Sequence, residues 1–159
     1  MAREVSLRSL GVLCLAGVIG CGGSPDSDDP DSVGALIELT LVREGPGPGR
    51  QAVEYAGEPT YLESEPVVSD PDFMHVEPVL RSGELALEFE LWPEAGDRLL
   101  SVSRASIGES LAIVVDSELR SVSVILDALG PRGRMSIDAT PEEGAELAEK
   151  VRSRWPPPD

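Results

Sequence analysis

Apolar and polar residues alternate along several short stretches of this chain, which is the pattern of strands with one buried face. Residues 37–41 show it first, after a segment of small and acidic residues. Residues 51–68 hold shorter apolar pieces interrupted by glycine and proline, so we expect only brief strands there. Residues 74–91 divide at Ser82-Gly83 into two runs, which predicts a β-hairpin.

The second half of the chain contains a continuous apolar run at residues 111–115, which suits a strand covered on both faces. A short polar turn separates it from residues 122–126, where the alternation returns. We therefore expect a second hairpin, with residues 111–115 at the centre of the sheet. Met135 and Ile137 mark one further strand.

Two stretches have the period of an amphipathic helix. The first begins at Pro93 and ends at Ile107, followed by the stop residue Gly108. Its apolar face is expected from Leu99, Leu100, Val102 and Ile107. The second follows Thr140-Pro141-Glu142-Glu143, which combines an N-cap, a first-turn proline and the glutamate of a capping box. Its packed face is expected from Leu147, Val151 and Trp155.

This order of elements predicts an α+β domain, in which a largely antiparallel sheet has two main helices packed on one face. The chain has 159 residues, enough for one domain with a single core. Only 4% of the residues are aromatic, so the core must consist mainly of aliphatic side chains.

The N-terminal residues have the organisation of a secretory signal. Arg3 and Arg8 precede an apolar run from Leu10 to Gly20, which is too short to cross a bilayer as a helix. The sequence Val18-Ile19-Gly20-Cys21 resembles the lipobox of bacterial lipoproteins, whose cysteine thiol receives a diacylglyceryl group before the leader is cleaved. We therefore expect cleavage after residue 20 and a membrane anchor of acyl chains.

Cys21 is then the lipidated residue and the only cysteine of the mature chain, because Cys14 is removed with the leader. An intramolecular disulfide is therefore excluded. Gly22, and not aspartate, follows Cys21, so we expect an exported protein at the periplasmic face of the outer membrane rather than the inner membrane. The alternative interpretation is an ordinary signal peptide with a chance cysteine at its cleavage site.

Residues 22–34 are small, acidic and without apolar periodicity, as expected for a solvated linker. The glycine turn and distal glutamate of a calcium loop are missing around its aspartates, Asp26, Asp28, Asp29 and Asp31. The predicted organisation is a leader at 1–20, the lipidated cysteine and linker at 21–34, a domain at 35–155 and a tail at 156–159.

The chain is strongly acidic, with 29 acidic and 13 basic residues and a formal charge of −16. Removing the leader takes away Arg3, Arg8 and Glu4, which leaves 28 acidic and 11 basic residues and a charge of −17. We exclude a nucleic-acid partner, because binding to phosphates needs clustered lysine and arginine. The charge is typical of a soluble surface.

Candidate catalytic groups are few. His75 is the only histidine, it lies in a predicted strand, and no Gly-x-Ser-x-Gly motif accompanies it. One histidine and scattered carboxylates do not supply the three protein ligands of a catalytic zinc ion. Glu88 and Glu90 share a strand face by alternation, and Glu142 and Glu143 belong to a helical first turn, where acidic side chains are favoured. We therefore predict no catalytic, cofactor-binding or metal site.

Three sequence blocks together resemble a known family. They are Tyr61-Leu62-Glu63 with Glu65-Pro66-Val67-Val68, then Arg98-Leu99 through Ile107-Gly108 to Leu111-Ala112-Ile113-Val114-Val115-Asp116, and Thr140-Pro141-Glu142-Glu143-Gly144-Ala145 with Leu147-Ala148. In order and spacing they are similar to the periplasmic head subdomain of SecD, the accessory membrane subunit of the Sec translocase. The resemblance covers residues 35–155.

The resemblance implies the α+β fold of that subdomain and a role in contacting preproteins. The sequence holds none of the membrane helices of SecD, so we do not expect a complete SecD. It also has Ser117 where the family favours glycine, and Ser121-Val122 where the family favours Ala-Pro.

We therefore expect an envelope lipoprotein with a non-catalytic interaction domain, held on the membrane by its lipid, whose partner is an envelope protein or a preprotein. One alternative is a small envelope hydrolase, which a deep pocket around His75 would favour. The other is a purely structural surface lipoprotein, which a featureless convex surface would favour. The sequence does not indicate an oligomeric state.

Overall fold

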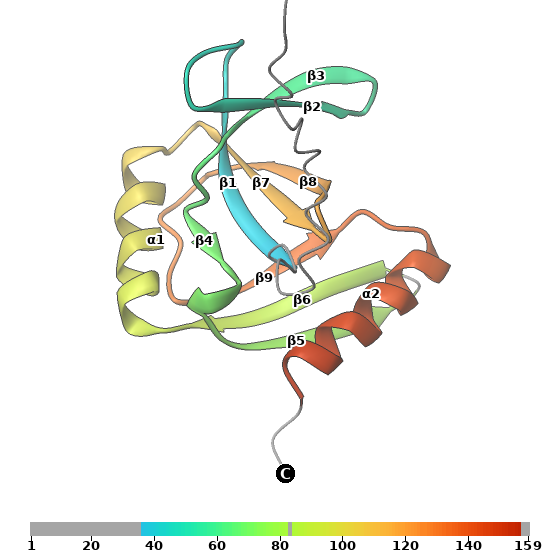
Figure 1. The fold of residues 1–159 in the computed structure, drawn as a ribbon. Coiled ribbons are helices and arrows are strands. Elements are labelled where there is room, and N and C mark those ends of the chain that lie inside the picture. Colours follow the sequence, from blue (N-terminus) through green and yellow to red (C-terminus); the bar gives the residue numbers. More distant parts are fainter. Residues whose placement is uncertain (1–35, 83, 157–159) are drawn as a thin grey trace, which may run out of the picture. The chain divides into compact units, whose positions relative to one another are not determined.

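The computed structural model describes residues 36–82 and 84–156, and Figure 1 shows how their strands and helices are arranged. The leader, Cys21 and the linker lie outside the described residues, so lipidation stays a prediction. No described helix is long and apolar enough to span a membrane. The core residues of the described part lie between Ile37 and Val151, so this part of the chain contains a complete core of its own.

The larger of two antiparallel sheets has the strand order β2-β3-β1-β7-β8, and the short β4 pairs with the first half of β1. The strands are β1 (Ile37–Arg43), β2 (Arg50–Tyr55), β3 (Glu58–Glu63), β4 (Val68–Ser69), β7 (Ser110–Val115) and β8 (Glu118–Val124). β7 lies between β1 and β8, and Leu111, Ala112 and Ile113 are buried in succession. The prediction of a strand covered on both faces is confirmed. Its predicted place at the centre of the sheet is wrong, because β1 is the middle strand and β7 lies next to the edge strand β8.

The smaller sheet has the order β5-β6-β9, with β5 (Phe73–Arg81), β6 (Glu84–Leu91) and β9 (Arg132–Ile137). β5 and β6 form the hairpin predicted for residues 74–91. The connection between the sheets passes through the short 3-10 helix η1 (Asp70–Asp72). Asp70 is buried, and its carboxylate accepts a hydrogen bond of 2.7 Å from the backbone N–H of Ile37, which ties this connection to the start of β1.

α2 (Pro141–Arg154) packs across β5 and β6 of the smaller sheet (Figure 1). Its capping box is confirmed. The Thr140 hydroxyl accepts from the N–H of Glu143 at 3.3 Å, and the Glu143 carboxylate accepts from the N–H of Thr140 at 2.9 Å. The predicted face packs into the core through Leu147, Val151 and Trp155.

α1 (Pro93–Ala105) ends before the predicted limit, and the assignment of Ile107 to its apolar face is wrong, because Ile107 lies beyond the helix and is 54% exposed. Ser103 is buried instead. Its hydroxyl donates to the carbonyl of Leu99 at 2.6 Å and accepts from the N–H of Leu129 at 2.8 Å. Because both hydrogen-bonding capacities are used, a serine can occupy this core position.

The core is aliphatic, as the composition predicts. Both sheets and both helices contribute completely buried side chains, among them Ile37, Val68, Val76, Leu85, Leu87, Leu99, Val115 and Val151. Within the described residues Phe73 is the one aromatic side chain that is buried. Periodicity located the strands correctly, but it did not divide them between two sheets.

Candidate interaction groove

The edge strands β8 and β9 of the two sheets meet directly at one point. The backbone N–H of Asp138 donates there to the carbonyl of Arg120 over 3.2 Å. The Tyr55 hydroxyl donates to the Asp138 carboxylate at 3.1 Å, and the Arg120 guanidinium lies 3.4 Å from the carboxylate of Glu143. Burial, and then the bond to Asp138, raise the pKa of Tyr55. We call this group of polar contacts the α2 junction.

A second connection between the sheets lies beside α1, where residues 125–131 link the end of β8 to the start of β9. The Ser103 hydroxyl holds Leu129 in this segment. A Cβ added to Gly96 of α1 would lie 2.5 Å from the Cβ of Pro131, so only glycine permits this close approach. We call these buried contacts the α1 junction.

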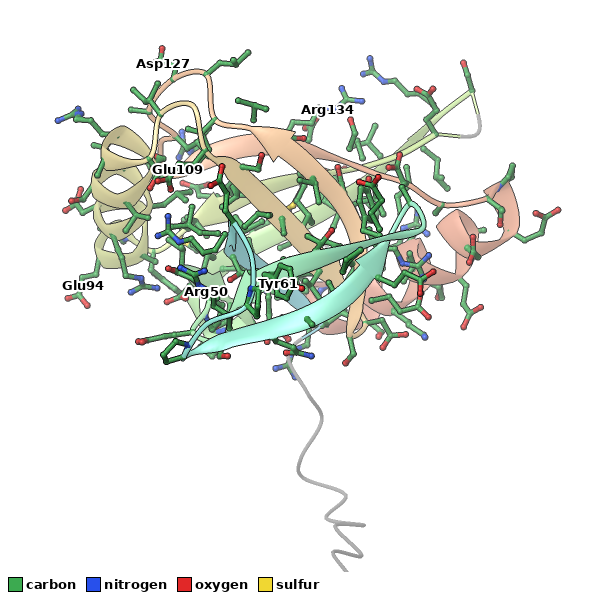
Figure 2. The ribbon with its side chains drawn as sticks, turned by 90° about the horizontal axis from the view of Figure 1, so that it is seen from above. Arg50, Tyr61, Glu94, Glu109, Asp127 and Arg134 are labelled. Atoms are coloured by element: carbon green, nitrogen blue, oxygen red, sulfur yellow. The ribbon has the colours of Figure 1, made fainter. Side chains whose placement is uncertain are left out.

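An apolar groove of about 490 Å³ lies between β8 and β9, and we call it the junction groove. Its floor is apolar, with Leu39, Leu111, Ile113, Phe89 and Met135. Its walls are the end of β8 with the residues that follow it, and β9 with Gly130 before it. Asp127 and Arg134, which border the groove, lie on the margin of the domain opposite Arg50 and Tyr61 of the β2–β3 hairpin (Figure 2).

Phe89 of β6 shapes the floor, because its ring lies over Gly133 of β9. A Cβ at residue 133 would be 2.7 Å from the Cζ atom of this ring. Phe73 packs edge-on against the same ring, with 5.9 Å between the centroids. The glycine therefore leaves the space that Phe89 fills.

The mouth of the groove is apolar on its β8 side. Val124 is 54% exposed and Leu126 is 85% exposed, and both line the groove. Single exposed apolar side chains are common, but a group of them beside an apolar groove indicates a surface that binds another molecule.

The β9 side of the mouth carries charges that are neutralised in pairs. Arg132 forms an ion pair with Glu90, and Arg134 lies 3.8 Å from the carboxylate of Glu88. The two glutamates identified in the sequence analysis therefore each have a basic neighbour across the strands. The groove gains no unpaired charge from them.

The structure does not bring the other candidate residues together. His75 is half-buried in β5, faces Glu90 in the strand register and does not line the junction groove. The backbone bond from Thr140, more than the Arg120 guanidinium, lowers the pKa of Glu143. Across residues 36–82 and 84–156 no three potential metal-ligating side chains cluster. The described residues therefore give the hydrolase alternative no support.

The sequence analysis did not identify Val124 and Leu126 as site residues. Alternation of apolar and polar residues predicts a strand, but it does not show whether that strand lies inside a sheet or at its edge. One indicator was present. Residues 121–126 contain no charged residue in a chain that is 26% charged, although they follow a polar turn. An uncharged stretch of this length at a sheet edge is unusual, since charge normally protects an edge from pairing.

The fold and the groove define the class of this protein: a two-sheet α+β domain with an apolar groove between its edge strands. Residues 49–154 match the family described as SecDF, P1 head subdomain, which is more than half of the chain. The chain therefore belongs to the SecDF P1 head subdomain family, and the resemblance seen in the sequence is confirmed.

Individual relatives agree with this assignment. The protein translocase subunit SecD of Aquifex aeolicus (strain VF5) is 34% identical over 71 residues, which are 45% of this chain and 14% of that protein. This chain thus matches a small part of the relative. A crystal structure of SecDF in a super-membrane-facing form aligns with a TM-score of 0.55 and 21% identity, over 77% of this chain and 19% of that one.

A second solved SecDF structure, of a membrane component that enhances protein export, aligns with a TM-score of 0.56 and 20% identity. It covers 87% of this chain and 73% of that chain. These two likenesses establish the shared α+β fold.

Ser117, which stands where the family favours glycine, lies in a turn with left-handed backbone angles. Asp116 and Ser117 both have positive φ angles, 55° and 65°, in the turn between β7 and β8. Glycine adopts this left-handed conformation without a Cβ clash, which explains why the family favours it there. The chain keeps the turn with two residues less suited to it.

Proposed function

We propose that this chain is a non-catalytic binding protein of the cell envelope, anchored through lipid on Cys21, whose junction groove holds an extended apolar segment of an exported polypeptide. The observation that carries the proposal is the groove itself, with an apolar floor and the exposed Val124 and Leu126 at its mouth.

The dimensions and lining of the groove support binding of this kind. Its volume lies within the range of about 300–1,000 Å³ that is usual for sites that bind small ligands. Burial of apolar surface stabilises a complex by about 25 cal/mol per Å², so a segment that covers the floor gains affinity without a specific polar partner. This favours recognition of many apolar segments over recognition of one sequence.

The family supports an exported polypeptide as the partner. The relative from Aquifex aeolicus is a protein translocase subunit, and the second SecDF structure is of a component that enhances protein export. Since this chain spans 14% of that relative, we carry over contact with an exported chain and not the activity of the whole translocase subunit. Gly22 after the predicted lipidation site favours the periplasmic face of the outer membrane.

Binding is tested with residues 33–159, which contain the complete core, and a fluorescent apolar peptide. Leu126→Ser should weaken binding about tenfold, equivalent to about 1.4 kcal/mol, because it removes an apolar contact at the mouth. Leu80→Ser is the matched control, since Leu80 is also exposed, at 43%, but lies in β5 and does not line the groove. Equal effects of the two substitutions would show that the groove is not the binding site.

The anchor is tested by intact mass and membrane fractionation of the natively expressed chain beside a Cys21→Ala variant. We expect the wild type to lose residues 1–20, gain acyl mass and remain in membranes. The variant should gain no acyl mass. If neither form is acylated and both are soluble, the lipoprotein assignment is wrong, while the proposal for the groove still stands.

A further inference from the structure

The ends of the two strand orders give four edge strands, and each carries charge or proline along part of its length. β2 carries an arginine and a glutamate, β5 carries Pro78, and β9 carries Arg132 and Arg134. Charge and proline on an edge strand prevent unwanted strand pairing. β8 carries Glu118 and Arg120 in its first half, but from Ser121 to Leu126 the strand and its continuation have neither charge nor proline.

The backbone of this unprotected edge faces the junction groove. Ile125 directs both its polar groups toward the β7 side, because its N–H donates to Glu109 and its carbonyl accepts from Gly108, each over 2.8 Å. Successive residues of a strand direct these groups to opposite sides. Val124 and Leu126 therefore direct their N–H and carbonyl groups away from β7 and toward the groove that both residues line.

The same alternation holds at the α2 junction. The carbonyl of Arg120 points away from β7 and bonds to Asp138. The part of the edge that faces the groove therefore lies beyond Arg120, from Val122 to Leu126.

β9 presents the opposite wall in the same way. The carbonyl of Pro131 accepts from the N–H of Leu91 in β6, so Arg132 and Arg134 direct their backbone groups away from β6. Two edges thus border one groove, and a backbone hydrogen bond joins them where Arg120 meets Asp138. A main chain in the groove would find hydrogen-bond partners on β8 and an apolar floor below it.

Charge adds a further requirement for the occupant. The chain has a formal charge of −16, and the arginines of the β9 wall are neutralised by Glu88 and Glu90. Long-range attraction therefore favours a segment with lysine or arginine beside its apolar part.

We propose that the segment bound in the junction groove adds to β8 as a further β-strand, a mode that rests on the function proposed above for the groove. Its backbone pairs with the edge from Val122 to Leu126. Alternate side chains of the segment are apolar and cover the groove floor, and basic residues flank them. Affinity then comes largely from main-chain bonds, which makes the site tolerant of sequence.

The probe is a fluorescent peptide in which valine and threonine alternate between terminal lysines, together with two N-methylated forms. One form carries methyl groups on alternate amides, and the other carries them on the remaining amides. Strand addition predicts that one form binds about tenfold more weakly, because its donors to β8 are gone. The other form should bind within about twofold of the parent. Equal losses in both forms would overturn strand addition, while binding by the parent would leave the groove's function intact.

Val124→Pro tests the same bonds from the side of the protein. Proline removes the N–H that faces the groove and spares the ladder between β7 and β8. We expect about a tenfold loss of affinity for the parent peptide. Val124→Thr, which keeps the N–H and the branched shape, should bind within about twofold of wild type. If the proline variant does not fold, as thermal melting will show, the two methylated peptides decide.

Two further outcomes distinguish a bound peptide from a second copy of this chain. Failure of the parent peptide and of every apolar peptide to bind would overturn the proposed function as well. Concentration-dependent dimerisation in sedimentation that Val124→Pro abolishes, with no peptide bound, would assign the edge to a second copy of this chain and overturn the proposal. Weaker binding of the lysine-flanked peptide at high salt, with no change for a serine-flanked one, is the expected electrostatic result.

Discussion

The α1 junction and the α2 junction connect the same two sheets, but they do so with different kinds of contact. At the α1 junction, Ser103 is buried and Gly96 approaches Pro131 closely. At the α2 junction, Arg120 and Glu143 form a pair whose glutamate is exposed to solvent. Buried contacts tolerate few substitutions, whereas exposed ion pairs contribute little and are screened by salt. The α1 end of the junction groove should therefore be rigid and its α2 end adjustable.

The largest effect is expected from glycine substitutions in the two helices. Gly96→Ala should lower the free energy of unfolding by about 2–3 kcal/mol, because the new Cβ overlaps Pro131. Gly144→Ala is the matched change in α2, where a Cβ would lie 3.5 Å from Leu85 in ordinary contact. It should raise stability by about 1 kcal/mol through helix propensity. Urea unfolding of both variants measures the two changes in free energy. If both changes have the same sign, the proposed difference in packing between Gly96 and Gly144 is wrong.

The next effect concerns the buried serine of α1. Ser103→Ala should cost about 1–2 kcal/mol, because the N–H of Leu129 loses its partner in a partly buried position. Ser101→Ala, at an exposed position of the same helix, should leave stability unchanged or slightly higher. Thermal unfolding measures the stability of both variants. An equal loss of stability in the two would show that the Ser103 contact does not make the α1 junction the more rigid one.

A smaller effect is expected at the cap of α2. Thr140→Ala should cost about 1 kcal/mol, because it removes the hydroxyl that accepts from the N–H of Glu143. Thr140→Ser keeps this acceptor and should retain most of the stability. Hydrogen exchange should show faster opening of the first turn of α2 in the alanine variant, with the amides of α1 unchanged.

The smallest effect is a loss of stability at low pH, which we expect only from the contacts of the α2 junction. The folded pKa of Glu143 is lowered from 4.5, so its contribution is present above pH 4.5 and is lost as the pH falls through the lower folded value. The α1 contacts of Gly96, Ser103 and Leu129 involve no titrating side chain. Glu143→Gln should therefore flatten the acid limb of a circular dichroism titration. An unchanged acid limb would show that other carboxylates dominate it.

Much of this fold follows from local rules. The hairpin of residues 74–91 was predicted from a polar turn between alternating runs. The start of α2 was predicted from residues 140–143, whose capping bonds are formed within one turn. The hairpin turn and the helix cap are formed by residues close together in the chain, so both can be predicted from the local sequence.

The features that were missed depend on contacts distant in the sequence. Ser103 appeared polar and Ile107 apolar, yet the first is buried by its bond to Leu129 and the second is exposed. The junction groove likewise arises because β8 and β9 belong to different sheets. Pairing between distant segments decides which sheet a strand joins. Alternation within one segment carries no information about that pairing.

The central place of β1 has a mechanical consequence. Everything that precedes the domain is joined to it through β1, which is paired with β7 along six positions and fixed at its start by Asp70. A pull on the N-terminal connection in the direction of β1, opposed by the rest of the sheet, would load the β1–β7 ladder along the strands. In this shear geometry the hydrogen bonds must break together, whereas peeling breaks them one after another. Tension applied along the start of β1 would therefore be resisted by the whole β1–β7 ladder at once.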